Sequence, residues 1–153
     1  MVAGERRNPM DRRRRPRGGR RRTDRPGAHP RLLVVEDDPA IRRLLTRYLR
    51  ARHFHVDAAS DGEAALACVA AVRPHLIVTD VQLPRLDGYG LLARLAAQPD
   101  TRDIPVIIFS AEADAPEKAT ELGCAAVLMK PASPRTLLEK IRDTLRSRPD
   151  ILG

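Results

Sequence analysis

Chemically active side chains stand at the ends of four apolar runs in this sequence. Two acids, Glu36 and Asp37, follow the first run, and Asp80 comes one residue after another. Ser110 and Lys130 directly follow two further runs. Hard divalent cations such as Mg²⁺ and Mn²⁺ bind carboxylate oxygens, while a hydroxyl and an ammonium can contact phosphate oxygens. Together these residues predict a site that binds a phosphoryl group beside a metal ion, with Asp80 available as the nucleophile of an aspartyl-phosphate.

The apolar runs themselves predict buried strands. Each run is short and does not alternate with polar residues, which is typical of strands covered on both faces. The expected strands are residues 32–35, 55–58, 76–78, 106–109 and 126–129, of which 55–58 is the weakest. Apolar residues between them recur at helical spacing, and the expected helices lie at about 39–49, 60–72, 91–95, 116–122 and 134–147.

Polar residues and a glycine mark the expected helix ends. Asp38, which precedes a proline, is the expected N-cap of the first helix. Ser60 and Glu63 have the spacing of a capping box for the second. Gly123 is expected to end the fourth helix, and Ser133 to open the fifth.

The repeated strand–helix order predicts an α/β fold. Its five-stranded parallel sheet is doubly wound, with right-handed crossovers and helices on both faces. The carboxyl ends of parallel strands lie at one edge, and ligands bind there at the point where the strand order reverses. The fold is therefore expected to bring the carboxylates, the hydroxyl and the ammonium to one crevice.

The charge of the chain is concentrated at its N-terminus. The 153 residues carry a formal net charge of +8, but residues 1–31 hold twelve Arg and three acids, so the remainder is close to neutral. This distribution excludes a globular fold that is basic throughout. Residues 1–30 have few apolar side chains, and we expect them to be disordered. Residues 149–153 are expected to form a short C-terminal tail.

No apolar run is long enough to cross a membrane, and none follows the Arg-rich start as in a signal peptide. The two cysteines, Cys68 and Cys124, have no partners at metal-ligand spacing, so we expect small buried side chains in a reducing compartment. A cytoplasmic protein is expected.

Four motifs in this sequence resemble those of bacterial two-component response regulator receiver domains. They are LLVVEDDP at 32–39, LIVTDVQLPRLDG at 76–88, IFSAE at 108–112 and VLMKP at 127–131, and the resemblance covers about residues 31–148. It implies the (βα)5 flavodoxin-like receiver fold. It also implies a stand-alone receiver similar to chemotaxis regulators, because no segment resembling an output or DNA-binding domain follows.

The resemblance assigns a role to each site residue. Asp80 matches the phosphoacceptor, and Asp37 the direct metal ligand. Glu36 matches the acid that binds Mg²⁺ (or Mn²⁺) through water, and the Gln82 backbone carbonyl would complete the protein ligands. The remaining matches are Ser110 and Lys130 for phosphate binding and switching, Pro131 for the often cis proline, and Gln82 with Glu112 for positions that influence phosphorylation lifetime.

The implied function is phosphoryl transfer from a sensor histidine kinase or histidine phosphotransfer protein to Asp80. The receiver would catalyse acceptance and slow autodephosphorylation itself, without being an enzyme that turns over substrate. It would then act by docking on an unknown partner or by phosphorelay. The Arg-rich tail is expected either to have no function, to be a start site placed too early, or to bind nucleic acid or an anionic surface non-specifically.

Departures from the family pattern leave alternatives open. Val127 stands at the switch position that usually holds an aromatic residue, and Ala132 stands where Phe is common. A degenerate receiver that only binds a partner is therefore one alternative. A phosphohydrolase of the haloacid-dehalogenase type is another, but its second Asp is replaced here by Gln82.

Overall fold

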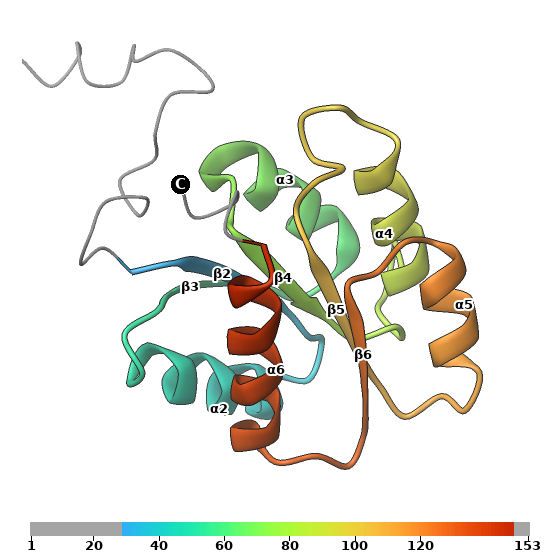
Figure 1. The fold of residues 1–153 in the computed structure, drawn as a ribbon. Helices are drawn as coiled ribbons and strands as arrows, with labels where there is room; N and C mark the ends of the chain where they lie inside the picture. Colours follow the sequence, from blue (N-terminus) through green and yellow to red (C-terminus); the bar gives the residue numbers. More distant parts are fainter. Residues whose placement is uncertain (1–28, 149–153) are drawn as a thin grey trace, which may run out of the picture.

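The computed structural model describes residues 29–148, and these form one α/β unit (Figure 1). A single sheet has the strand order β3-β2-β4-β5-β6, and every pairing in it is parallel. The strands are β2 (Arg31–Val35), β3 (His55–Ala59), β4 (Leu76–Thr79), β5 (Val106–Ser110) and β6 (Ala126–Met129). The predicted doubly wound, five-stranded parallel sheet is confirmed. Apart from two residues, the predicted N-terminal tail lies outside the described residues, as does the predicted C-terminal tail.

A helix follows each strand, and the first four helices return the chain to the start of the next strand. The helices are α2 (Pro39–Arg50), α3 (Gly62–Val72), α4 (Gly88–Ala96), α5 (Ala115–Glu121) and α6 (Pro134–Arg146). Helices α2 and α6 lie on one face of the sheet, and α3, α4 and α5 lie on the other (Figure 1). None of the described helices is both long and apolar enough to span a bilayer.

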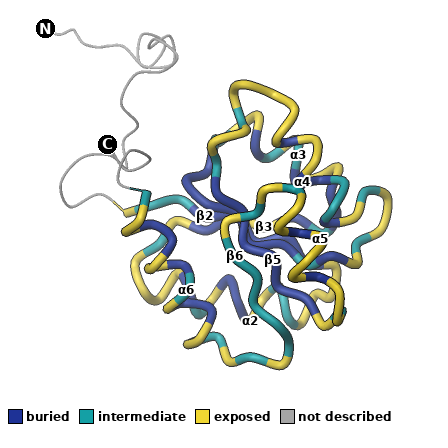
Figure 2. Tube along the Cα trace, turned by 45° about the vertical axis from the view of Figure 1, so that its right-hand side comes forward, coloured by how far each residue is buried: buried dark blue, intermediate teal, exposed yellow. Residues whose placement is uncertain are grey.

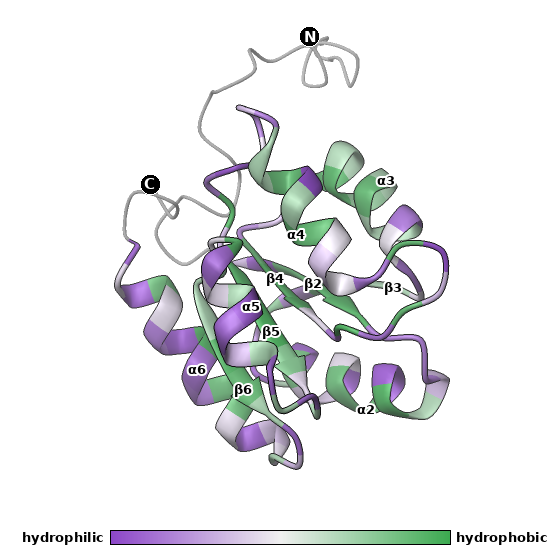
Figure 3. Ribbon diagram, turned by 90° about the vertical axis from the view of Figure 1, so that its right-hand side faces the viewer, coloured by the Kyte–Doolittle hydropathy of each residue, from purple (hydrophilic) through white to green (hydrophobic). Residues whose placement is uncertain are grey.

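The core consists of two apolar clusters, one on each face of the sheet. Successive strand residues point to opposite faces, so Leu33 and Val35 join the cluster under α3, α4 and α5, whereas Leu32 and Val34 join the one under α2 and α6. This is why the apolar runs do not alternate. The residues of the central strands are accordingly buried, whereas the outer faces of the helices are exposed (Figure 2). The hydropathy colouring follows the same division (Figure 3).

Most predicted helix ends are confirmed, but one cap is wrong. Asp38 and Ser133 cap their helices, and Gly123 follows α5 with a φ of +89°. The second helix is capped by Asp61 instead of Ser60, and the Asp61 side chain accepts a hydrogen bond from the Ala64 amide at 2.7 Å. The Asp61 carboxylate also accepts a hydrogen bond from Arg85 Nε at 2.9 Å, and this long-range contact favours Asp61 over Ser60 as the cap.

Candidate functional site

The candidate site lies where the strand order reverses. Strand β2 has β3 on one side and β4 on the other, and Val35 is in register with Thr79. The amide of Asp80 donates to the Val35 carbonyl at 3.1 Å, so the chain segments after these two strands begin side by side. Because β2 and β4 are neighbours in the sheet, their carboxyl ends lie side by side. Acidic residues more than 40 positions apart in the sequence are thereby brought together.

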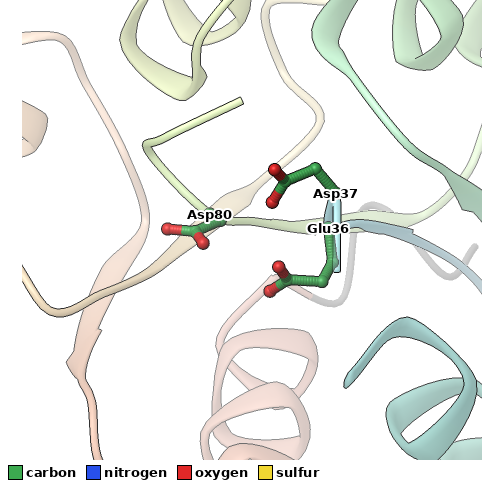
Figure 4. A group of neighbouring side chains, drawn as sticks. All are labelled: Glu36, Asp37 and Asp80. Carbon is green, nitrogen blue, oxygen red and sulfur yellow. The ribbon is translucent and has the colours of Figure 1, made fainter. Parts of the chain in front are cut away.

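Three carboxylates converge at these strand ends. Glu36, Asp37 and Asp80 each offer an oxygen within 4.8 Å of the others, and no other such acidic, His or Cys group occurs within residues 29–148. Glu36 is buried, Asp37 is exposed, and Asp80 is intermediate. Figure 4 shows the side chains of Glu36 and Asp37 turned from the end of β2 toward the Asp80 side. Open on one side, this acidic cluster has the donor type and accessibility that a hard divalent cation requires.

Lys130 reaches the acidic cluster from the far edge of the sheet. Its Nζ lies 3.1 Å from Asp80 Oδ2 and 3.3 Å from Glu36 Oε1. Its backbone amide donates to the Ser110 carbonyl at 2.8 Å, which fixes the residue just beyond β6. The Lys130 Nζ also lies 5.1 Å from the centroid of the Phe109 ring, within the range of a cation–π contact. The ammonium therefore partly neutralises the acidic cluster.

The pKa values of the paired groups reflect this crowding. Burial raises the pKa of Glu36 most, and the neighbouring Asp80 charge raises it further, against the opposing effects of the Asp38 amide and Lys130. Burial by itself would lower the pKa of Lys130, but the carboxylates of Asp80 and Glu36 more than offset it and raise that pKa. The site thus holds excess negative charge that a bound cation would relieve.

Asp80 is held in place by its own loop. Its Oδ1 accepts a hydrogen bond from the Val81 amide at 2.7 Å, while Oδ2 contacts Lys130. Gly88 lies against the same loop, and a Cβ added there would stand 2.3 Å from the Asp80 carbonyl oxygen and 2.8 Å from Val81 Cα. Glycine is required here because main chain occupies the space of a side chain.

We expect Gly88→Ala to destabilise the fold by about 1–3 kcal/mol through overpacking, and to displace Asp80 as well. Thermal unfolding with and without Mg²⁺ measures both effects, and the variant should lose most of the Mg²⁺-induced rise in Tm. Gly123→Ala is the matched control, because Gly123 has a positive φ but nothing within 4 Å of its added Cβ. An equal loss of the Mg²⁺ response in both variants would contradict this account.

The predicted hydroxyl residue lies at the end of β5. Ser110 is 1% exposed, and its Oγ accepts a hydrogen bond from the Glu112 amide at 3.0 Å. Gln82 donates from Nε2 to Glu112 Oε2 at 2.8 Å, so the two predicted lifetime positions bridge the β4–α4 and β5–α5 segments. The structure thus gathers Glu36, Asp37 and Asp80 within 4.8 Å of one another and joins Lys130 to two of them. Ser110, Gln82 and Glu112 form a second connected group.

The predicted switch position and the proline lie on either side of Lys130. Val127 is half-buried in β6, is in register with Ile108, and packs against the cluster beneath α3, α4 and α5. The peptide bond between Lys130 and Pro131 is cis. Both cysteines are free and half-buried.

Arg42 is a site residue that the sequence analysis missed. Its Nη1 donates to the Glu36 carbonyl at 2.8 Å and to the Asp37 carbonyl at 3.4 Å. From the first turn of α2, the guanidinium thereby fixes the backbone that carries two of the three acids. The only available signal was an Arg on a helix immediately after an acidic pair, and that spacing does not indicate backbone contacts.

A second missed contact holds the β4–α4 loop against α3. Arg85, at a φ of +68°, donates from Nε to Asp61 Oδ2 at 2.9 Å, and the Gly62 amide donates to the Leu86 carbonyl at 3.1 Å. Asp61 is therefore both a helix cap and an anchor for the loop that follows Asp80.

This anchor predicts a pH dependence of stability. The hydrogen bond from the Ala64 amide, followed by that from Arg85, lowers the pKa of Asp61 from its ordinary value of 3.8. Its stabilisation is present above pH 3.8 and is lost as the pH falls through the lower pKa of the folded state. Urea unfolding between pH 5 and pH 3 should show a smaller loss of stability for Asp61→Asn than for wild type, with Arg85→Gln intermediate. Equal slopes for wild type and Asp61→Asn would contradict this assignment.

Comparison with known proteins places these features in one family. The model of the response regulator receiver domain matches residues 32–142. The probable transcriptional regulator ycf27 of Cyanophora paradoxa is 40% identical over 118 residues, which are 76% of this chain and 48% of that protein. The response regulator MprA of Mycobacterium leprae is 38% identical over 123 residues, which are 78% of this chain and 53% of that protein. The chain spans about half the length of these curated relatives.

Solved structures show the same fold. The chemotaxis response regulator CheY4 of Vibrio cholerae matches with a TM-score of 0.72 and 26% identity, over 76% of this chain and 99% of that one. A putative response regulator from Chloroflexus aurantiacus matches with a TM-score of 0.73 and 30% identity, over 77% of this chain and 98% of that one.

Proposed function

This chain belongs to the family of response regulator receiver domains, and we propose that it accepts a phosphoryl group on Asp80 from a phosphohistidine of a sensor kinase or phosphotransfer protein. The observation that carries the proposal is the meeting of three carboxylates with one ammonium at the point where the strand order reverses. Receiver domains in two-component signalling typically use such a cluster for Mg²⁺-dependent phosphorylation.

The chemistry assigned to Asp80 is a displacement at phosphorus. A carboxylate oxygen forms the new P–O bond as the P–N bond to the donor imidazole breaks, and the electron pair leaves with the ring nitrogen. Lys130 lies within 3.1 Å of the same carboxylate and neutralises charge on the transferred group. Hydrolysis later returns Asp80 as a free carboxylate when water attacks phosphorus and inorganic phosphate departs.

Glu36, Asp37 and Asp80 would hold Mg²⁺ or Mn²⁺, with the Gln82 backbone carbonyl as a further ligand. The ion supplies charge stabilisation to the phosphoryl oxygens when it is bound. The raised pKa of Glu36 supports this assignment, since a carboxylate destabilised by burial and a neighbouring charge gains most from a cation.

Signalling is proposed to follow from modification and not from turnover of a small substrate. The chain would act in the cytoplasm, either by docking on a downstream protein or by passing its phosphoryl group onward. Relatives named as transcriptional regulators match over only half their length, so DNA binding is assigned to none of the described residues. A receiver that only binds a partner is the second candidate, because Val127 and Ala132 replace the aromatic residues common in the family.

Intact-mass measurement on the full chain tests the proposal. Incubation with Mg²⁺ and a small acyl-phosphate donor should add about 80 Da, the mass of one phosphoryl group, in a form labile to base. Borohydride reduction followed by peptide mapping should locate the modification at Asp80, and chelation of Mg²⁺ should prevent it. An unmodified mass with the fold intact would reject phosphoryl acceptance and leave the binding-only receiver.

A further inference from the structure

Three histidines gather at the amino-terminal edge of the sheet. His53 and His55 lie at the start of β3, and His29 lies just before β2. The His29 ring stacks on the His53 ring with their centroids 5.5 Å apart, and its centroid lies 5.9 Å from that of the His55 ring. The fold therefore adds a third imidazole to a pair that is only two positions apart in the sequence.

The pairing of β2 with β3 brings these residues together. Arg31 is in register with His55, and the His55 amide donates to the Pro30 carbonyl at 2.9 Å. Continuing this parallel register by two residues places His29 beside His53. The His53 backbone has a φ of +71°, a left-handed conformation that His adopts more readily than most residues. The main chain thus fixes the positions from which all three side chains extend.

The spacing of the rings suits a shared metal ion. Two imidazoles on one tetrahedral Zn²⁺ have centroids about 5 Å apart, because each Zn–N bond is about 2.0–2.1 Å long. The observed spacings of 5.5 Å and 5.9 Å are close to this value. The three histidines do not yet have ring nitrogens that all lie within 4.8 Å of one another. They are exposed, however, and exposed side chains change rotamer freely, so the rings can turn toward a common ion.

Other groups at this edge are paired with one another. The Arg31 guanidinium lies 2.9 Å from the Asp57 carboxylate, and the Arg52 guanidinium lies 3.8 Å from the centroid of the Tyr48 ring. The remaining histidine of the chain, His75, is 1% exposed, and its Nδ1 accepts a hydrogen bond from the Arg31 amide at 3.0 Å. His75 is therefore no ligand of an exposed ion, and it can serve as an internal reference.

We propose that His29, His53 and His55 form a second metal site, which takes a divalent transition-metal ion of the Zn²⁺, Ni²⁺ or Cu²⁺ class with water as a further ligand. Imidazole nitrogens suit these ions, whereas Mg²⁺ prefers the oxygen ligands of the acidic cluster. The two sites lie at opposite ends of β2, so this inference does not depend on the proposed function. A bound ion fastens the chain segment that enters β2 to the segment that enters β3.

A titration of the full chain with Zn²⁺ in the presence of excess Mg²⁺ tests the site. The excess Mg²⁺ competes for the acidic cluster, and the imidazole proton signals in NMR report on each of the four histidines. At one equivalent of Zn²⁺, the signals of His29, His53 and His55 should shift while those of His75 stay in place. Sedimentation should show an unchanged molecular mass, because the three ligands belong to one chain.

Removal of single ligands gives the second measurement. His29→Asn and His53→Asn should each weaken Zn²⁺ binding by at least about 10-fold, since even the loss of a group that only supports a ligand costs that much. Asn tolerates the left-handed backbone of His53. Arg73→Asn is the matched control, because Arg73 also has a positive φ, and it should bind Zn²⁺ as wild type does. Asp80→Asn should likewise keep wild-type Zn²⁺ affinity.

Each outcome decides between these possibilities. Wild-type affinity in His29→Asn overturns the inference, because His53 and His55 would then bind the ion without the third ring. An equal shift of the His75 signals, or a dimer that holds half an ion per chain, also overturns it. Weaker binding in both histidine variants with wild-type binding in Arg73→Asn and Asp80→Asn supports it. A chain that binds Zn²⁺ in this way but is not phosphorylated supports the inference and overturns only the proposed function.

Discussion

Replacing Asp80 by Asn should abolish the covalent addition of a phosphoryl group entirely. An amide oxygen is a much weaker nucleophile than a carboxylate, and within residues 29–148 no other carboxylate has the same contacts with Val81 and Lys130. Intact mass after incubation with Mg²⁺ and the acyl-phosphate donor measures the effect. Far-ultraviolet circular dichroism should show an unchanged fold, because the substitution keeps the shape of the side chain.

Asp38→Asn is the matched control for that variant. Asp38 lies at the same edge of the sheet, but its carboxylate caps α2 by accepting from the Ala40 amide at 2.8 Å. Asn caps helices about as well as Asp, so both stability and phosphorylation should be retained. Modification of the Asp80→Asn variant at wild-type level would show that the nucleophile lies elsewhere.

Replacing Lys130 by Ala should have the second largest effect. Loss of a charged group that faces the developing phosphoryl charge is expected to slow phosphorylation by about 10²- to 10³-fold. In the presence of a chelator, the variant should also lose on the order of 3 kcal/mol of stability, because the buried Glu36 and the half-buried Asp80 lose their shared cation. The rate by intact mass and the free energy of unfolding by urea titration measure the two effects.

In the Lys130→Ala variant, Mg²⁺ should restore much of the lost stability but little of the lost phosphorylation rate. The ion can replace the neutralising charge of Lys130, so the Mg²⁺-induced rise in Tm should be larger in Lys130→Ala than in wild type. Lys140→Ala, a half-buried lysine of α6, is the control and should match wild type in both measurements. A Lys130→Ala variant that is phosphorylated at the wild-type rate would contradict the role given to the ammonium.

The Lys130 contacts show what long-range geometry adds to a sequence. Lys130 is 94 positions from Glu36 and 50 from Asp80, yet its Nζ bonds both. The apolar run before it predicted that Lys130 would lie at a strand end. Only the strand order, with β6 at one edge and β4 two strands away, determined that its side chain must reach past β5 to the acids.

The helix caps show the limit of local signals. Ser60 and Glu63 have a capping-box spacing, but Asp61 caps α3 and also accepts from Arg85. The second contact joins α3 to the loop after β4, and no local window of sequence contains both. A residue with a partner far along the chain can therefore override the cap that its neighbours predict.

The sequence by itself determined the strand–helix order, the two-sided burial of the strands and the placement of acids, hydroxyl and ammonium at strand ends. Those features follow from the spacing of apolar residues, which is local and has a fixed period in each element. The tertiary structure alone decided which of these groups touch and that Arg42 holds the acidic backbone. Such contacts depend on strand order, register and packing between segments far apart in the chain, and these are set by the whole fold and not by any one segment.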